Sequence, residues 1–354
     1  MQITLFSLFM SVIWSGALVV FNHFCRKNPF LIRQLGITNL LCLYLFPVLR
    51  MILPCEFSFT RVIYSPEVFD DIYANKTGAV QITVVTVLLT VWAAVAVVLL
   101  LRFAVQYRRM LKIFSTCSVC ESEQCRRVFN RVLNTCKRQV KVEIRQSRYI
   151  QIPMGAGIFR RCILLPEKEY GDSELYYILR HEYTHFQNRD LTVKIFMYIY
   201  WCIFWWNPVI YFLKKDMEQL LEIKCDLDVT AHMGNRDKAE YLATIVAMLK
   251  NAEAKKEERL FCGAATLVSG SGGAKIVERF QIVSSGCGNG RKNGLFAGGW
   301  LLIFVLLTAA SYSFAVRPDY EMPEEAAADD RNPAASGYRM ECIDGTYYVH
   351  FNEF

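Results

Sequence analysis

The sequence predicts a mainly α-helical membrane protein that crosses the bilayer several times and carries an α+β domain at its cytoplasmic face. Two observations predict this fold class. Hydrophobic residues make up 53% of the 354 residues, which exceeds the usual fraction in soluble domains. Apolar runs of about twenty residues, long enough to cross a hydrocarbon layer of roughly 30 Å as a helix, also recur along the chain.

Four segments are predicted to span the membrane: residues 1–25, 35–55, 79–105 and 294–316. The second contains Pro47 and Arg50, but Arg50 lies near one end, where its side chain reaches the interface, and neighbouring helices can satisfy a proline break. A signal peptide is the alternative for the first segment. We favour a span, because no basic residue precedes this apolar run and it is longer than a usual signal core.

The charges of the loops predict the orientation. The link 26–34 carries basic and no acidic residues, and the stretch that follows the third span is also basic, so both are expected inside. The loop 56–77 and the tail 317–354 are net acidic and are expected outside. We therefore expect a plasma-membrane protein with both termini outside and a large cytoplasmic region, residues 106–293.

The formal net charge of +7 does not by itself indicate a nucleic-acid-binding protein. Excess basic charge on the inner side is explained by contact with anionic lipid, and no nucleic-acid-binding module is visible. Membrane lipid is therefore an expected partner, and direct binding of nucleic acid is not expected.

The cytoplasmic region changes its hydrophobic period twice. The segment 123–139 has the pattern of an amphipathic helix, whereas residues 140–165 alternate or form short apolar runs typical of two or three strands. Helical spacing returns after Asp172 or Ser173, either of which is a suitable N-cap. The apolar run 191–213 is divided at Asn207 and Pro208.

The helix that begins there contains the candidate metal site, in the letters "HEYTH". Residues four apart lie on one face of a helix, so His181 and His185 can present two imidazole nitrogens to one Zn²⁺ ion. Glu182 then lies where a general base of a metallopeptidase is needed. The chain has only five histidines, so a chance match to this spacing is rare.

A catalytic zinc ion needs a third protein ligand. Glu222 and Asp226 are four apart on a predicted helix, so one can bind the metal while the other accepts the second ring N–H of a ligand histidine. Glu218 and Asp228 are competing candidates on the same helix.

Three stretches carry a resemblance to a known family: "ILRHEYTHFQNRD", "IPMGAGIFRRCILLP" and "WWNPVIYFLKKDMEQLLEIKCDLDV". They resemble the membrane-embedded zinc peptidases of the BlaR/MecR type, peptidase family M56, and the resemblance extends from the first span to Val283. It implies a mainly α multipass membrane protein with an embedded cytoplasmic α+β zincin-like metallopeptidase domain.

The resemblance also implies roles for individual residues. His181, His185 and Glu222 would be the zinc ligands, Glu182 the catalytic base, and Asp226 the partner that orients a ligand histidine. If His185 and Glu222 bind one ion, the chain between them must leave and return to the same side. We therefore expect a helical hairpin over 191–214 that dips into the inner leaflet.

The implied function is a zinc-dependent endopeptidase that transduces a signal by cleaving itself or a cytoplasmic, repressor-like regulator. The penicillin-binding sensor domain of the family is expected to be absent, because only a short acidic tail follows the last span. One alternative is a quality-control peptidase for membrane proteins. Another is a non-enzymatic receptor with structural zinc, which would not need Glu182.

The cysteines suggest two further features. Cys117, Cys120 and Cys125 are expected to be free thiols, since no histidine lies nearby and the spacing lacks a clean second pair for zinc. Cys55 and Cys342 both fall outside, so a disulfide between them is left open.

Overall fold

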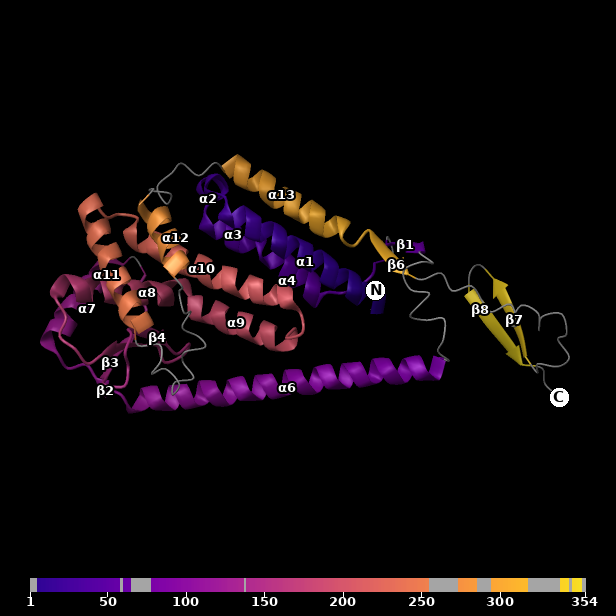
Figure 1. Ribbon diagram of the computed structural model, residues 1–354, viewed down its shortest axis with the longest axis horizontal. Helices are drawn as coiled ribbons and strands as arrows, with labels where there is room; N and C mark the ends of the chain where they lie inside the picture. The colour runs from indigo at the N-terminus through magenta and orange to yellow at the C-terminus, as the bar shows by residue number, and fades with distance from the viewer. Residues whose placement is uncertain are drawn as a thin grey trace.

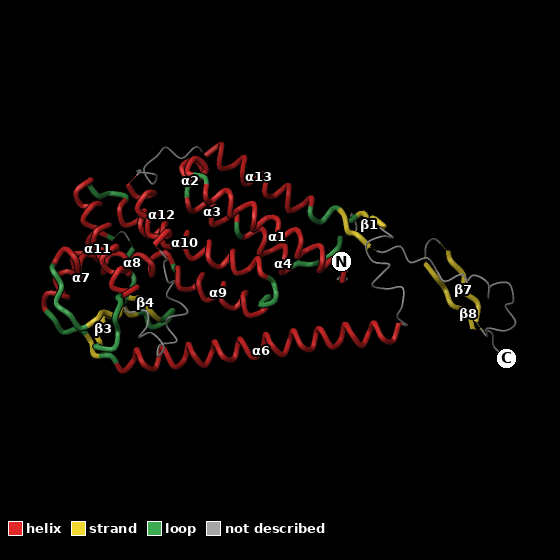
Figure 2. The backbone as a smooth tube through the Cα atoms, viewed as in Figure 1, coloured by secondary structure: helices red, strands yellow, loops and turns green. Residues whose placement is uncertain are grey.

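The structure is a computed structural model that describes residues 5–57, 60–64, 78–136, 138–254, 273–284, 294–317, 338–343 and 346–351. Its described part is mostly helical, with one four-stranded sheet and two two-stranded sheets (Figures 1 and 2). The predicted combination of a helical body with a small α+β region is confirmed.

A helical bundle forms one part of the molecule: α1 (Leu5–Lys27), α2 (Pro29–Leu35), α3 (Ile37–Leu43), α4 (Leu45–Ile52) and α13 (Gly294–Ala310). The α1–α2 turn is fixed by Asn28, whose side chain accepts a hydrogen bond from the backbone N–H of Phe30 at 3.0 Å. Leu40, Tyr44 and Phe304 lie fully buried in the core that the bundle shares with helices of the site. Burial of this apolar surface holds the bundle against the rest of the chain.

Two described helices are long and apolar enough to cross a membrane by length and composition alone: α1 and α6 (Gly78–Thr116). The helix α6 continues past the expected span 79–105 and is unbroken over 39 residues. It lies beside α9 along one side of the molecule (Figure 1).

Two of the expected spans differ from single continuous helices. Residues 35–55 contain the two short helices α3 and α4, which meet at Tyr44. In 294–316 the helix ends at Ala310, and β6 (Phe314–Arg317) pairs in parallel with β1 (Arg61–Tyr64). Hydropathy alone misses these breaks because a strand and a helix can be equally apolar.

The four-stranded sheet has the order β2-β3-β5-β4, with β2 (Ser118–Val119), β3 (Glu143–Ser147), β4 (Met154–Ala156) and β5 (Cys162–Pro166). The expected strands in 140–165 are confirmed as three, and β2 is an addition. All five residues of β5 are buried, and it packs with α7 (Glu123–Thr135) and α8 (Asp172–Asn188). Because β5 is internal, β4 forms one edge of the sheet, and β2 forms the other.

The expected helical hairpin over 191–214 falls on two packed helices, α9 (Asp190–Ile203) and α10 (Pro208–Thr230), the second of which extends beyond the expected end. Its turn ends at Asn207, whose side chain accepts a hydrogen bond from the N–H of Val209 at 3.0 Å, and α10 begins at Pro208. The downstream helix expected around Glu222 is the continuation of α10. The position of the hairpin in the membrane stays a prediction.

The remaining described elements are α11 (Asn235–Ala254), α12 (Gly273–Ser284), and the antiparallel pair β7 (Tyr338–Ile343) and β8 (Thr346–Phe351). Both α11 and α12 pack against the region of α8 and α10. They complete the surroundings of the candidate site.

Three cysteines of interest carry free thiols: Cys117, Cys120 and Cys125. The side chain of Cys342 lies outside the described residues, so its pairing with Cys55 stays open. Among the described residues, the group whose ligand atoms converge closely enough to hold a metal ion is His181, His185 and Cys225.

Candidate metal centre

The helix α8 presents both histidines of the motif to one point. Its apolar face packs on β5 and α7, so the opposite residues are held firmly toward α10. The Nε2 atoms of His181 and His185 lie 3.2 Å apart. Both rings are largely buried, with side-chain exposures of 6% and 13%.

A left-handed residue between α8 and α9 orients the second histidine. Arg189 ends α8 in a left-handed conformation with φ 60°, and α9 begins at the next residue, Asp190. The change of direction places Asp190 beside the last turn of α8. The Nδ1 atom of His185 donates to the Asp190 carboxylate at 2.7 Å. This hydrogen bond leaves the Nε2 lone pair of His185 free for a metal ion.

The hydroxyl of Tyr241 orients the first histidine. It lies 2.8 Å from Nδ1 of His181 and donates its single proton to Oδ1 of Asp226 at 2.6 Å. The hydroxyl therefore accepts from Nδ1–H of His181. Asp226 lies 3.5 Å from the same nitrogen, so the predicted partner acts on His181 through Tyr241.

Glu222 is the carboxylate that α10 brings to the two histidines. Its Oε2 atom lies 3.7 Å from both Nε2 atoms, and its Oε1 atom accepts from Lys194 at 3.0 Å. The competing candidate Asp228 instead bonds to Asn188 at 2.8 Å and is half exposed. Neither Asp228 nor Glu218 lines the cavity described below.

The pKa of Glu222 reflects these contacts. Burial alone raises it, but the Lys194 ammonium, together with the charge and hydrogen bonds that the two histidines supply when they are protonated, lowers it well below its usual value. The side chain is thus held as a carboxylate, the form that binds metal ions.

The donor set fits a zinc ion. Both Nδ1 protons are committed to acceptors, so two Nε2 lone pairs face each other beside a carboxylate oxygen, an arrangement that favours a cation between them. Ligand atoms that share a tetrahedral zinc ion with bonds of about 2 Å lie roughly 3.3 Å apart, close to the separations found here.

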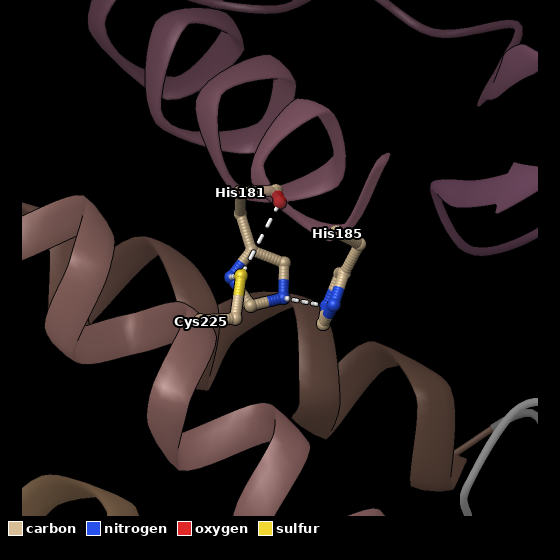
Figure 3. Close-up of side chains that lie close together, drawn as sticks. All are labelled: His181, His185 and Cys225. Atoms are coloured by element: carbon tan, nitrogen blue, oxygen red, sulfur yellow. Dashed lines mark hydrogen bonds between the residues drawn. The ribbon is translucent and has the colours of Figure 1, made fainter. Parts of the chain in front are cut away.

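Cys225 offers a second donor set. Its sulfur lies within 4.8 Å of ligand atoms of both histidines. Figure 3 shows it beside Nδ1 of His181, at 3.6 Å, whereas Nε2 turns to His185. Because Tyr241 already bonds that Nδ1, the free Nε2 atoms are better matched by Glu222 than by the thiol.

A cavity of about 140 Å³ opens onto these side chains and is lined by Glu182 as well as by all of β4. No described residue hydrogen-bonds to the Glu182 carboxylate. Gly155 of β4 approaches it closely: an added Cβ would lie 3.5 Å from Glu182 Oε2 and 3.0 Å from the Phe186 ring. The strand that borders the cavity beside Glu182 is therefore β4.

Three residues of the site were missed from the sequence: Lys194, Tyr241 and Arg279. Lys194 is the one charged residue in the run "LTVKIFMY", which is an available signal for a functional role. Arg279 lies in an amphipathic stretch between Gly/Ser-rich segments, and Tyr241 is one of 18 tyrosines, so their roles appear only from tertiary contacts.

Comparisons with known proteins identify the family of the chain. A family model described as BlaR1 peptidase M56 matches residues 63–281. The regulatory protein BlaR1 of Bacillus licheniformis is 29% identical over 104 residues, which cover 28% of this chain and 17% of the relative.

Two further relatives come from Staphylococcus aureus. The methicillin resistance mecR1 protein of strain Mu50 is 27% identical over 39% of this chain and 25% of its own length. A BlaR1 regulatory protein is 25% identical over 46% of this chain and 28% of its own length. The matched part of the chain thus spans less than a third of each of these relatives.

Proposed function

Because the chain belongs to the BlaR1 peptidase M56 family, we propose that it is a membrane-embedded, zinc-dependent endopeptidase that transmits a signal by cleaving itself or a cytoplasmic regulator of transcription. The observation that carries the proposal is the convergence of His181, His185 and Glu222 inside one cavity, beside a Glu182 carboxylate that no described residue hydrogen-bonds.

The zinc ligands in this proposal are the two Nε2 atoms and the Glu222 carboxylate. Bound zinc supplies Lewis acidity, which polarises a peptide carbonyl and acidifies water. Asp190 and Tyr241 hold the two rings with Nε2 turned to the ion. The Lys194 ammonium holds Glu222 by its outer oxygen, so the inner oxygen stays directed to the histidines.

Glu182 is the proton carrier. Its carboxylate has no described hydrogen-bond partner and faces the cavity, so it is free to accept a proton from the attacking water. As the C–N bond of the substrate breaks, Glu182 returns that proton to the leaving amine. The products are a carboxylate and an amine, and the enzyme is regenerated.

The edge strand β4 supports a peptide substrate in extended form. A sheet edge offers unpaired backbone groups to an added strand, and β4 borders the cavity beside Glu182. Gly155 lets this strand approach the carboxylate and the Phe186 ring without a side chain between them.

The relatives named as regulatory and resistance proteins support a regulatory use, and the two long apolar helices support membrane insertion. In this proposal both termini lie outside and the cavity lies at the cytoplasmic membrane surface. The cleaved protein is the chain itself or a repressor-like regulator, and no direct contact with nucleic acid is required.

The test is Glu182→Gln in the purified full chain, placed in lipid vesicles with Zn²⁺. We expect self-cleavage and cleavage of an unfolded reporter protein to fall at least about a hundredfold, because the proton carrier is lost, while bound zinc is retained. Glu218→Gln is the matched control, since Glu218 does not line the cavity. Equal proteolysis by Glu182→Gln and the parent chain would rule out the hydrolase.

A further inference from the structure

Helix α12 contributes a buried arginine to the metal centre. Arg279 has a side-chain exposure of only 6%, and it lines the cavity. Its Nε atom donates to Oδ2 of Asp226 at 2.6 Å, and its Nη2 atom donates to Oδ1 at 2.8 Å. A bidentate pair of this kind fixes the orientation of the carboxylate as well as its charge.

The same guanidinium also reaches a proposed metal ligand. Its Nη1 atom lies 3.4 Å from Oε2 of Glu222, the oxygen directed to the histidines. Since Arg279 carries a planar group with fixed donor directions, the positions of Asp226 and Glu222 are set relative to each other.

The orientation of Asp226 in turn determines the hydrogen bonding of His181. Oδ1 of Asp226 accepts from Tyr241, and the Tyr241 hydroxyl accepts from Nδ1–H of His181. A carboxylate that rotates away would leave the Tyr241 proton without this acceptor, and the hydroxyl would then be free to donate to Nδ1 of His181. That change moves the ring proton to Nε2 and blocks the metal-binding nitrogen.

We propose that Arg279 is a positioning residue, which keeps Nε2 of His181 unprotonated and the Glu222 carboxylate directed to the histidines. This inference rests on the proposed zinc peptidase function. Metal binding therefore depends on the packing of α12 against α10. The neighbouring residue Glu278 holds α12 in place, because its carboxylate accepts hydrogen bonds from Arg26 of α1 at 2.7 Å and from Gln219 of α10 at 3.2 Å.

The test measures zinc affinity of the purified full chain in detergent by competition with a chromophoric chelator. We expect Arg279→Met to weaken zinc binding roughly 10- to 100-fold, the usual effect of removing a partner of a metal ligand. Arg279→Lys keeps the positive charge but loses the planar guanidinium that bonds Asp226 through two nitrogens. This variant should therefore retain only part of the affinity for zinc. The matched control Arg236→Met removes an exposed pair with Glu240 and should leave affinity unchanged.

A second readout separates positioning from general destabilisation. Co²⁺ in place of Zn²⁺ reports on ligand geometry, so Arg279→Met should change its visible absorption. If Arg279→Met fails to fold, the double variant Asp226→Asn/Arg279→Met removes both buried charges. It should fold, with thermal unfolding as the check, and should still bind zinc weakly.

The outcomes distinguish this inference from the function on which it rests. If Arg279→Met, or the double variant, has the zinc affinity and the Co²⁺ absorption of the parent chain, the positioning role is wrong. The peptidase proposal would then remain intact. If the His181→Ala variant instead binds zinc as tightly as the parent chain, the proposed metal site itself is wrong.

Discussion

Glu222 and Cys225 are the two described residues that offer a third ligand to the histidine pair, and they approach His181 differently. The Glu222 oxygen lies 3.7 Å from Nε2 of both rings. The Cys225 sulfur lies near Nδ1 and bonds to the main-chain oxygen of His181 at 3.4 Å. This difference predicts that the thiol is dispensable for metal binding.

We expect Cys225→Ala to bind one Zn²⁺ ion with nearly unchanged affinity, whereas Glu222→Ala loses tight binding, because only the carboxylate faces both Nε2 atoms. The measurement is zinc stoichiometry after dialysis against a weak chelator. Co²⁺ provides a second criterion, since a thiolate ligand adds a strong charge-transfer band. Such a band in the parent chain, lost in Cys225→Ala, would contradict a Glu222 site.

At the residue scale, the sequence predicts best what depends on local spacing. The pair His181 and His185 follows from one turn of helix. Glu222 was assigned by family resemblance, and the structure places it at the pair. Tyr241 and Arg279 act across 60 and 53 residues of chain, and no helical period carries such contacts.

The α9–α10 hairpin is the element that brings the ligands together. α9 has 14 residues, so it rises roughly 21 Å, which is less than the hydrocarbon thickness of about 30 Å. We therefore predict that the hairpin enters the membrane and returns to the side from which it entered. Trp206, near its turn, is 40% exposed and is a suitable position for a probe.

We expect Trp206→Cys to remain unlabelled by a membrane-impermeant maleimide applied from outside the cell, because the turn lies within the membrane. Labelling of the parent chain is subtracted. Arg61→Cys on the outer side should react from outside, and Tyr149→Cys only after the inner face is exposed. Labelling of Trp206→Cys equal to that of Arg61→Cys would contradict a cytoplasmic metal site.

The errors at the element scale have physical causes. The sequence located strands between 140 and 165, but it gave no means to tell that β5 is internal and β4 is at an edge, because strand order depends on pairing. It also treated Pro208 and Glu222 as parts of separate helices. They share α10, since proline is tolerated in the first turn of a helix.

Across the whole molecule, one carboxylate connects the helical bundle to the helix of the metal site. Asp216 of α10 has a side-chain exposure of 2% and accepts from His23 of α1 at 2.7 Å and from Tyr44 at 2.9 Å. Arg26 of α1 lies 3.1 Å away and also bonds to Glu278 of α12. The network therefore connects α1 to α10, which carries Glu222, and to α12, whose Arg279 contacts Glu222.

We expect Asp216→Asn to destabilise the folded chain by roughly 3 kcal/mol, because the buried Arg26 loses a charged partner. The measurement is the midpoint of urea or thermal unfolding in detergent. Asp228→Asn on the same helix is the control, since that side chain is 47% exposed and its removal should have little effect. An equal shift in both variants would contradict a special role for the network.

The length of α6 has a mechanical consequence. Its 39 residues extend roughly 58 Å, about twice the thickness of the hydrocarbon layer, without a break. Met110 and Phe114, near its inner end, form part of the cavity wall that faces Glu182. If the protein acts as the proposed peptidase, we expect a tilt of this long helix to move that wall and to change the opening of the cavity.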